Sequence, residues 1–325
     1  MKTRGWTSPA LAVLCFAALI VFLGPHDLTT VLSSAVRLSV PLLLAALGEY
    51  VAERAGTLNI SVEGMMLGGA YAAAIGSSVT GSAGIGLLWG MGAGLVVGII
   101  HGNFSHRLQV NTFVVGLTLN VLVLGLTNYL VAKIEMTPKQ VGILTIPVLS
   151  HIPLLGKPLF SQRWPAFLLY ALVPAVWWVV QRSRWGLEMR SVGENPKAAD
   201  VTGIHVNKRR RQGLMWCGLL AGLGGAYLAV GEVGTFNSNM TAGRGFIVIA
   251  AVIFGGWTLR GSVAGCLLFG GADALRLALP AIGWKINPQL LISSPYLLAL
   301  IVMCFFAQRL RQPAALAQPF ERGAV

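Results

Sequence analysis

The most constraining feature of this chain is a charged segment, residues 185–211, that lies between two stretches without any charge. The flanking stretches, residues 164–180 and 213–230, are apolar and close to the roughly 20 residues that a helix needs to cross the hydrocarbon of a bilayer. The charged segment must lie in water, because charged side chains are costly in lipid. This alternation predicts an all-α, polytopic integral membrane helix bundle.

Composition supports the same class and excludes others. Hydrophobic residues make up 55% of the chain and charged residues only 11%, and the mean hydropathy is +0.72. A soluble chain would carry roughly 25% charged residues. A net charge of +13 would suit nucleic acid, but the basic residues are spread over the polar segments between apolar runs, as membrane topology requires. We therefore expect a lipid bilayer around the protein and no nucleic-acid partner.

The apolar runs predict about ten transmembrane helices, with a range of eight to eleven. Residues 245–257 are short for a span, and Gly56 and Asn59 interrupt residues 49–61, which could lie at membrane depth. The first run could instead be a cleaved signal peptide, but no small-x-small site follows it promptly, so we favour a retained span. The expected spans are residues 8–24, 30–48, 62–79, 84–101, 110–132, 164–181, 213–232, 245–257, 261–279 and 291–308.

The distribution of Lys and Arg predicts the orientation. With the N-terminus inside, the cytoplasmic segments are both tails and residues 49–61, 102–109, 182–212 and 258–260, which together hold most of the 24 Lys and Arg residues. This bias places both termini and the loop 182–212 in the cytoplasm. The longest outer segment, residues 133–163, is expected to be an ordered surface loop. No second domain is visible, so the whole chain, 1–325, is expected to form a single transmembrane domain.

One short helix within the loop 182–212 has clear end signals. Asn195 can act as N-cap, Pro196 suits the first helical position, and Gly203 supplies a left-handed stop. A capped helix on the cytoplasmic face of a polytopic protein predicts a docking element for another protein. The basic run 208–211 that follows is interpreted as a positive-inside anchor for the next span. We expect the helix to cover residues 196–202 and to expose Ala198, Ala199 and Val201 to its partner.

The chain lacks the sequence signatures of catalysis and of cofactor binding. It contains no GxxxxGK[ST], GxSxG or HExxH motif, so we expect neither enzymatic activity nor a cofactor on this chain. The four cysteines stand alone within apolar runs, which indicates neither a metal site nor a disulfide. The five histidines, including His101 and His106, lie in or next to predicted loops and are expected to be solvated.

Polar residues inside the apolar runs are the remaining chemical signal, because an unpaired polar group is costly in lipid. We expect these side chains to face the bundle interior. For Asn120, a hydrogen bond to a neighbouring helix is the alternative to a role in transport. The residues expected to line a substrate pathway are Glu49, Asn59, Glu63, Asn111 and Asn120.

Several other charges in the apolar runs are expected to pair. Asp273 and Arg276 lie three residues apart and should share one helix face. Arg37 should snorkel to the interface or reach a carboxylate such as Glu49. Glu53 and Arg54 could form a charge pair at the membrane interface.

Three motifs together resemble the permease subunits of ABC importers for nucleosides and simple sugars. They occur in the family's order and spacing, and the likeness covers roughly residues 38–271. The first motif is more similar to the nucleoside branch of the family than to the ribose branch. The motifs are GEYVAERAGTLNISVEGMM at 48–66, RSVGENPKAADVTGI at 190–204, and MTAGRGFI at 240–247, continuing with AAVIFGGW at 250–257.

This resemblance implies an ATP-driven importer in the bacterial cytoplasmic (inner) membrane. Its expected partners are one or two ABC ATPase subunits, a second permease that is usually a different chain, and an extracytoplasmic substrate-binding protein. The capped helix becomes the coupling helix that sits in a cleft of the ATPase. The residues expected to couple to the ATPase are Glu194, Asn195, Pro196, Ala198, Ala199 and Gly203.

Two other function classes remain open at this point. An ion-coupled secondary transporter of a small polar solute would need carboxylates at mid-membrane, for which Glu63 and Asp273 are the candidates. A membrane-embedded structural or assembly protein is the third possibility. The missing phosphate-binding loop is compatible with all three, because an importer's ATP hydrolysis belongs to a separate subunit.

Overall fold

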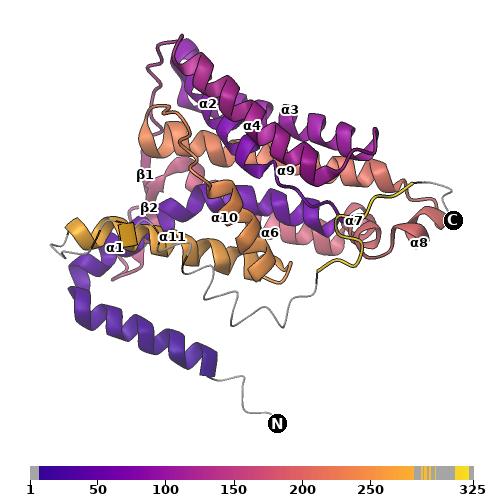
Figure 1. Cartoon of the computed structure of the whole chain (residues 1–325). Helices are drawn as coiled ribbons and strands as arrows, with labels where there is room; N and C mark the ends of the chain where they lie inside the picture. The colour runs from indigo at the N-terminus through magenta and orange to yellow at the C-terminus, as the bar shows by residue number, and fades with distance from the viewer. Residues whose placement is uncertain are drawn as a thin grey trace.

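The computed structural model describes residues 7–281 and 312–321, together with a few isolated positions between them, and gives side chains from residue 27 onward. This part of the chain is a bundle of helices (Figure 1). The long helices are α1 (Thr7–Arg54), α2 (Val62–Thr80), α3 (Ala83–His106), α4 (Thr112–Val131), α6 (Trp164–Arg182), α9 (Val206–Ala226), α10 (Arg244–Phe254) and α11 (Leu259–Ala281). The seven residues Tyr227–Val233 continue α9 as a π-helical segment, η2.

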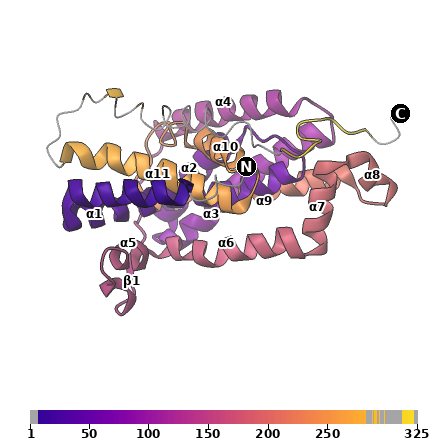
Figure 2. The same cartoon turned by 90° about the horizontal axis from the view of Figure 1, so that it is seen from below.

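Short elements lie at the two ends of the bundle. The predicted outer loop is ordered, as expected. It holds the antiparallel strands β1 (Ile143–Thr145) and β2 (Ser161–Arg163), a 3-10 turn η1 (Leu149–His151) and α5 (Gly156–Phe160). The predicted cytoplasmic loop holds α7 (Arg184–Glu194) and α8 (Pro196–Val201). Figures 1 and 2 place these two sets of elements at opposite ends of the molecule, as a bundle that crosses a membrane requires.

Six helices in the described part of the chain are long and apolar enough to cross a membrane. The predicted runs 62–79 and 245–257 also form helices, α2 and α10, but these are less apolar or shorter than the six. The run 8–24 belongs to the first part of α1, which Figure 1 shows as a bent helix, and the run 291–308 lies outside the described residues. The total of ten spans and the cytoplasmic position of both termini stay predictions. The six helices are Asp27–Arg54, Ala83–His106, Thr112–Val131, Trp164–Arg182, Val206–Val233 and Leu259–Pro280.

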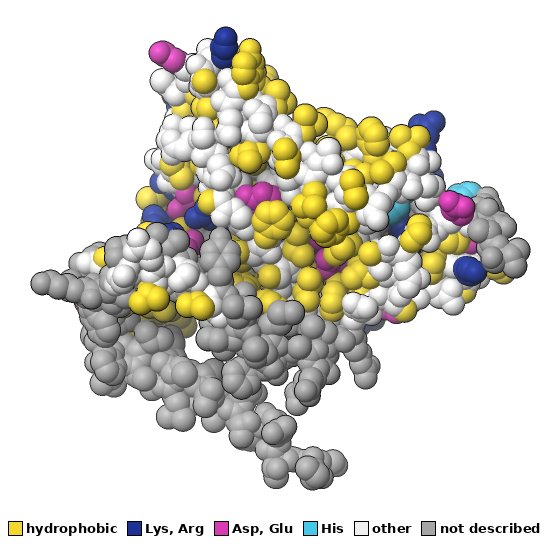
Figure 3. All heavy atoms as spheres, in the orientation of Figure 1, with side chains coloured by type: hydrophobic (Ala, Val, Ile, Leu, Met, Phe, Trp, Pro, Cys, Tyr) yellow, Lys and Arg dark blue, Asp and Glu magenta, His cyan; other side chains and the backbone are white. Residues whose placement is uncertain are grey.

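The outer surface of the bundle is rich in exposed apolar side chains, as lipid contact requires. Leu88 of α3, Leu122 of α4 and Trp178 of α6 are each more than half exposed. On the face drawn in Figure 3, hydrophobic side chains gather over the middle, together with a few Asp and Glu side chains, while Lys and Arg side chains lie toward the ends.

Small residues bring α2, α3 and α9 into close contact at the centre. A Cβ on Gly69 of α2 would lie 2.6 Å from the Cα of Gly222 in α9, and a Cβ on Gly94 of α3 would meet the carbonyl of Gly218. The glycines of this chain therefore serve helix packing, which is their usual role in membrane bundles.

The α1–α2 link (residues 55–61) passes through the interior instead of forming an exposed loop. It turns at Gly56, whose φ is 84°, and Thr57, Asn59 and Ser61 are fully buried. The expectation that residues 49–61 form a loop in water is therefore wrong for residues 55–61, and the alternative that this stretch lies at membrane depth stays a prediction. Irregular backbone can persist in such a bundle when protein groups satisfy its hydrogen bonds.

Candidate functional site

A buried polar network starts at Glu49 of α1. Asn59 in the link donates from Nδ2 to Glu49 Oε2 over 2.9 Å, and the thiol of Cys217 in α9 donates to the same oxygen over 3.2 Å. All three side chains are fully buried. Two of the predicted pathway residues, Glu49 and Asn59, are thus in direct contact.

The network continues through His101 of α3. The hydroxyl of Ser61 lies 2.8 Å from Asn59 Oδ1 and 2.7 Å from His101 Nδ1. On the other side of the ring, His101 Nε2 lies 2.9 Å from the hydroxyl of Thr112, which donates to the carbonyl of Leu58 over 3.1 Å.

The prediction of solvated histidines is wrong for His101 and His106. Both are buried, and His106 Nε2 lies 2.9 Å from the hydroxyl of Thr57. The physical reason is that α3 continues beyond the predicted end at residue 101, so that its last turns pack against the α1–α2 link. In the sequence, the only indication that these histidines have buried partners is the pair of hydroxyl residues in the link, Thr57 and Ser61.

Glu63, in the first turn of α2, binds the N-terminal end of α10 through both of its carboxylate oxygens. Its Oε1 accepts from the Thr241 hydroxyl over 2.6 Å and from the Gly243 amide over 2.8 Å, and its Oε2 accepts from the Gly245 amide over 2.6 Å. These donors lie at the N-terminus of α10, where a carboxylate is favoured by the unpaired amides and the helix dipole. Glu63 therefore joins the first sequence motif to the third.

Asn120 of α4 also joins two segments, through both ends of its amide. Its Oδ1 accepts from the Gly64 amide over 2.8 Å, and its Nδ2 donates to the Ile60 carbonyl over 2.8 Å. Asn120 thus forms the hydrogen bond to a neighbouring helix that the sequence analysis gave as the alternative to a role in transport. Asn111 stands apart from the network: it is exposed and caps α4, accepting from the Phe113 amide over 2.9 Å.

Glu53 is a functional candidate that the sequence analysis did not select. It lies one helical turn after Glu49 and is fully buried, and its carboxylate faces the side chains of Glu49 and Trp257 without a hydrogen bond of regular geometry. The buried Trp257, in the third motif, is thus a neighbour of Glu53, and its indole Nε1 likewise makes no hydrogen bond of regular geometry within the described part of the chain. Buried polar atoms without partners are rare in native proteins and often mark functional positions.

The other charged residues find partners, with two changes from expectation. The predicted pair of Arg276 with Asp273 is confirmed at 3.0 Å. Arg37 pairs with Glu232 at 3.2 Å and not with Glu49. Arg54 reaches Glu194 at 3.8 Å, so its partner is Glu194 and the possible charge pair with Glu53 is not formed.

The predicted coupling helix is present as α8. Asn195 caps it, with Oδ1 accepting from the Ala198 amide over 3.0 Å, Pro196 is its first residue, and Gly203 follows its end with φ of 86°. Glu194, directly before the cap, is exposed.

The expected exposure of α8 is correct at two of three positions. Ala198 is exposed and Val201 is 89% exposed, but Ala199 is only 4% exposed. Ala199 packs in a small cluster with Val192, Val206 and Phe320. A short helix that lies on the bundle must turn one side inward, and here that side carries Ala199.

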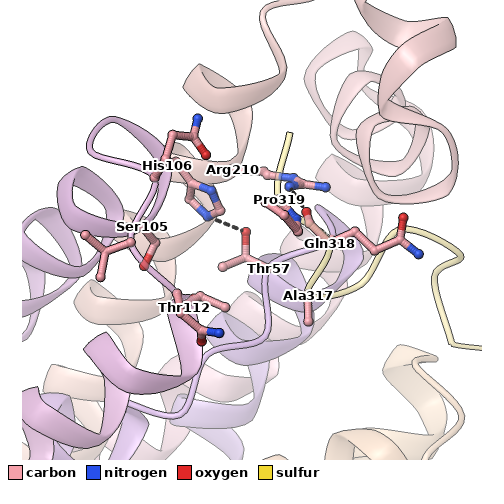
Figure 4. Close-up of a pocket in the computed structure, with 12 residues that line it drawn as sticks. Thr57, Ser105, His106, Thr112, Arg210, Ala317, Gln318 and Pro319 are labelled. Atoms are coloured by element: carbon pink, nitrogen blue, oxygen red, sulfur yellow. Dashed lines mark hydrogen bonds between the residues drawn. The ribbon is translucent and has the colours of Figure 1, made fainter. Parts of the chain in front are cut away.

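A polar cavity of about 190 Å³ lies between the α1–α2 link, the end of α3, the start of α4 and residues 317–319 (Figure 4). Its walls include Thr57, His106 and Arg210. Arg210 is only 1% exposed, although the sequence analysis placed it in a solvated basic anchor. That interpretation is wrong for Arg210, because its guanidinium is engaged by backbone carbonyls of the C-terminal segment.

Comparison with known proteins shows which family the chain resembles. Residues 31–307 match the family described as branched-chain amino acid transport system / permease component. The chain is 34% identical over 298 residues to the guanosine ABC transporter permease protein NupQ of Bacillus subtilis, covering 87% of this chain and 93% of that protein. It is 34% identical to the nucleoside ABC transporter permease protein NupC of Lactococcus lactis, covering 85% and 92%. It is also 34% identical to the putative glucose ABC transporter permease protein TsgC13 of Haloferax volcanii, covering 90% and 97%.

Proposed function

Because the chain belongs to the family of branched-chain amino acid transport system permease components, and is a permease subunit of an ABC transporter, we propose that it carries nucleosides across the membrane. The observation that carries this proposal is the similarity over nearly the full length to NupQ and NupC, whose names give guanosine and nucleosides as cargo. TsgC13, named for glucose, makes a sugar the second candidate.

The translocation path is proposed to run along α1, beside Glu49, Glu53 and Asn59. These residues offer carboxylate and amide groups that can bind the hydroxyl groups of a ribose and the polar edge of a base. Glu63 and Asn120 use their hydrogen-bonding atoms to hold α10 and the α1–α2 link. We assign these two residues to maintaining the path and Asn111 to capping α4, outside the path.

The partners follow from the family. We propose that α8 docks on an ABC ATPase, which supplies the ATP hydrolysis, and that a second permease and an extracytoplasmic binding protein complete the importer. The exposed face of α8, with Ala198 and Val201, is the contact for the ATPase. In this arrangement α8 and both termini lie in the cytoplasm of a bacterium, and the chain is a multi-pass protein of its inner membrane.

The geometry weakens the alternative of an ion-coupled secondary transporter. Its two candidate carboxylates are occupied: Glu63 binds three donors around α10, and Asp273 pairs with Arg276 and with Arg244 at 3.4 Å.

The substrate class is tested by uptake with the assembled complex. Cells that produce the permease with its ATPase, second permease and binding protein are given labelled guanosine, with unlabelled nucleosides or glucose as competitors. We expect nucleosides to compete and glucose to have no effect. No uptake of labelled guanosine, together with ATP-dependent uptake of labelled glucose by the same complex, would assign the sugar branch instead.

A further inference from the structure

The C-terminal segment 313–320, which we call the strap, lies at the α8 end of the bundle beside α7 and α8 (Figures 1 and 2). Two backbone hydrogen bonds tie it to separate parts of the molecule. The Ala315 amide donates to the Gly193 carbonyl over 2.9 Å, two residues before the cap of α8. The Ala317 amide donates to the Gly56 carbonyl over 3.1 Å, at the turn that starts the α1–α2 link.

Arg210 of α9 binds the strap through its guanidinium group. Its Nη1 donates to the Gln318 carbonyl over 2.6 Å and its Nη2 donates to the Ala315 carbonyl over 3.3 Å. Figure 4 shows Arg210 next to the strap residues, with Thr57 and His106 on the opposite wall of the cavity. A buried guanidinium is costly unless it is hydrogen-bonded, so the strap and Arg210 stabilise each other's position.

Phe320 anchors the strap under α8. Its ring is buried in the cluster with Val192, Ala199 and Val206. Its carbonyl accepts from Gln109 Nε2 over 3.1 Å and from Asn207 Nδ2 over 3.3 Å. The inward face of α8 therefore rests on a side chain that comes from the C-terminal segment.

We propose that the strap positions α8 and passes its displacement to the α1–α2 link, and so to the buried polar network. The proposal rests on the proposed function, in which α8 receives the movement of the ATPase. A six-residue helix held only by its neighbours α7 and α9 would pivot when pushed. The strap adds a second connection, from α8 through Phe320 and Ala317 to Gly56, one residue before Thr57.

The test uses the assembled importer in lipid vesicles, with Phe320→Ala against the matched control Glu321→Ala, whose side chain is exposed next to the same position. Two rates are measured: nucleoside uptake, and ATP hydrolysis stimulated by loaded binding protein. We expect the ratio of transport to hydrolysis to fall by about threefold to thirtyfold in Phe320→Ala, which is the range for changes within a coupling connection. Phe320→Leu should restore the ratio, and Glu321→Ala should leave it unchanged.

A structural role alone would give a different pattern. If Phe320→Ala lowers the amount of assembled complex but keeps the wild-type ratio, or leaves both unchanged, the proposal is overturned. If Phe320→Ala does not assemble, the double variant Gln109→Ala, Asn207→Ala decides, because it removes only the two donors to the Phe320 carbonyl. A wild-type ratio in that variant overturns the proposal, and a lowered ratio supports it. Failure of the proposed function is distinct: the wild-type complex would then show no nucleoside uptake.

Discussion

At the scale of single residues, the hydrogen-bond partners of a buried polar side chain distinguish residues that hold two helices together from residues that could contact a transported substrate. Glu63 receives three hydrogen bonds and Asn120 makes two, whereas Glu53 faces Glu49 and Trp257 without a hydrogen bond of regular geometry among the described residues. The sequence correctly marked Glu49, Asn59, Glu63 and Asn120 as interior residues, because polar groups in apolar runs avoid lipid.

Replacing Glu63 with Gln should destabilise the protein. The amide has one acceptor oxygen in place of two, so a donor at the start of α10 loses its partner. We expect a loss of about 1–3 kcal/mol, seen as a lower unfolding temperature of the purified protein. Glu135→Gln, at an exposed loop position, is the control. Equal unfolding temperatures for the two variants would show that these hydrogen bonds have no effect on stability.

Replacing Glu53 with Gln should have the opposite pattern. The neutral amide cannot ionise beside the buried Glu49, which removes the cost of placing two carboxyl groups next to each other in the interior, so we expect an unfolding temperature equal to or above that of the wild type. Nucleoside uptake by the assembled complex should fall if Glu53 borders the path. Wild-type uptake together with a lowered unfolding temperature would make Glu53 a packing residue.

The roles of these residues could not be read from the sequence, for a physical reason. The donors to Glu63 come from residues 241–245, far away in the chain, and only the packing of α10 against α2 brings them together. The same holds for His101, whose partners Ser61 and Thr112 belong to other elements.

At the scale of elements, the ends of α8 were predictable and its orientation was not. Asn195, Pro196 and Gly203 act through their own backbone chemistry, so the sequence located the helix. The inward face depends on Phe320, which lies more than 100 residues away in the chain. This is why the predicted exposure of Ala199 is wrong.

Adjacent positions on α8 give a matched test of the two faces. Ala198→Trp should leave the unfolding temperature unchanged but reduce ATP-driven uptake, because the side chain lies on the exposed face. Ala199→Trp should lower the unfolding temperature, because overpacking a buried site costs typically about 1–3 kcal/mol. Wild-type uptake by an assembled Ala198→Trp complex would exclude this face as the ATPase contact.

Substitutions at Gly203 test whether its left-handed backbone conformation is needed where α8 ends. No described atom would lie within 4 Å of a Cβ at this position, so space does not limit substitution, but φ is 86°. Gly203→Val should cost about 1–2 kcal/mol because of the left-handed conformation, whereas Gly203→Asn should cost less. Thermal unfolding of the two variants measures the difference, and equal values would contradict the backbone explanation.

At the scale of the whole molecule, the sequence located most helices because bilayer thickness sets their length. The predicted runs 110–132, 164–181 and 261–279 agree with α4, α6 and α11 within a few residues. The differences lie where charged residues continue a helix: α1 extends to Arg54, and α9 starts at Val206, before its basic run. In these extensions Arg54 pairs with Glu194, and Arg209 pairs with Glu188.

The most direct test of the account is nucleoside accumulation by the complete complex in lipid vesicles. The permease is reconstituted with its ATPase, its second permease and the binding protein, and labelled guanosine is followed with and without ATP on the α8 side. We predict accumulation that requires both ATP and binding protein and that persists when ionophores remove all ion gradients. Accumulation without ATP that collapses with an ionophore would contradict the account and identify an ion-coupled transporter.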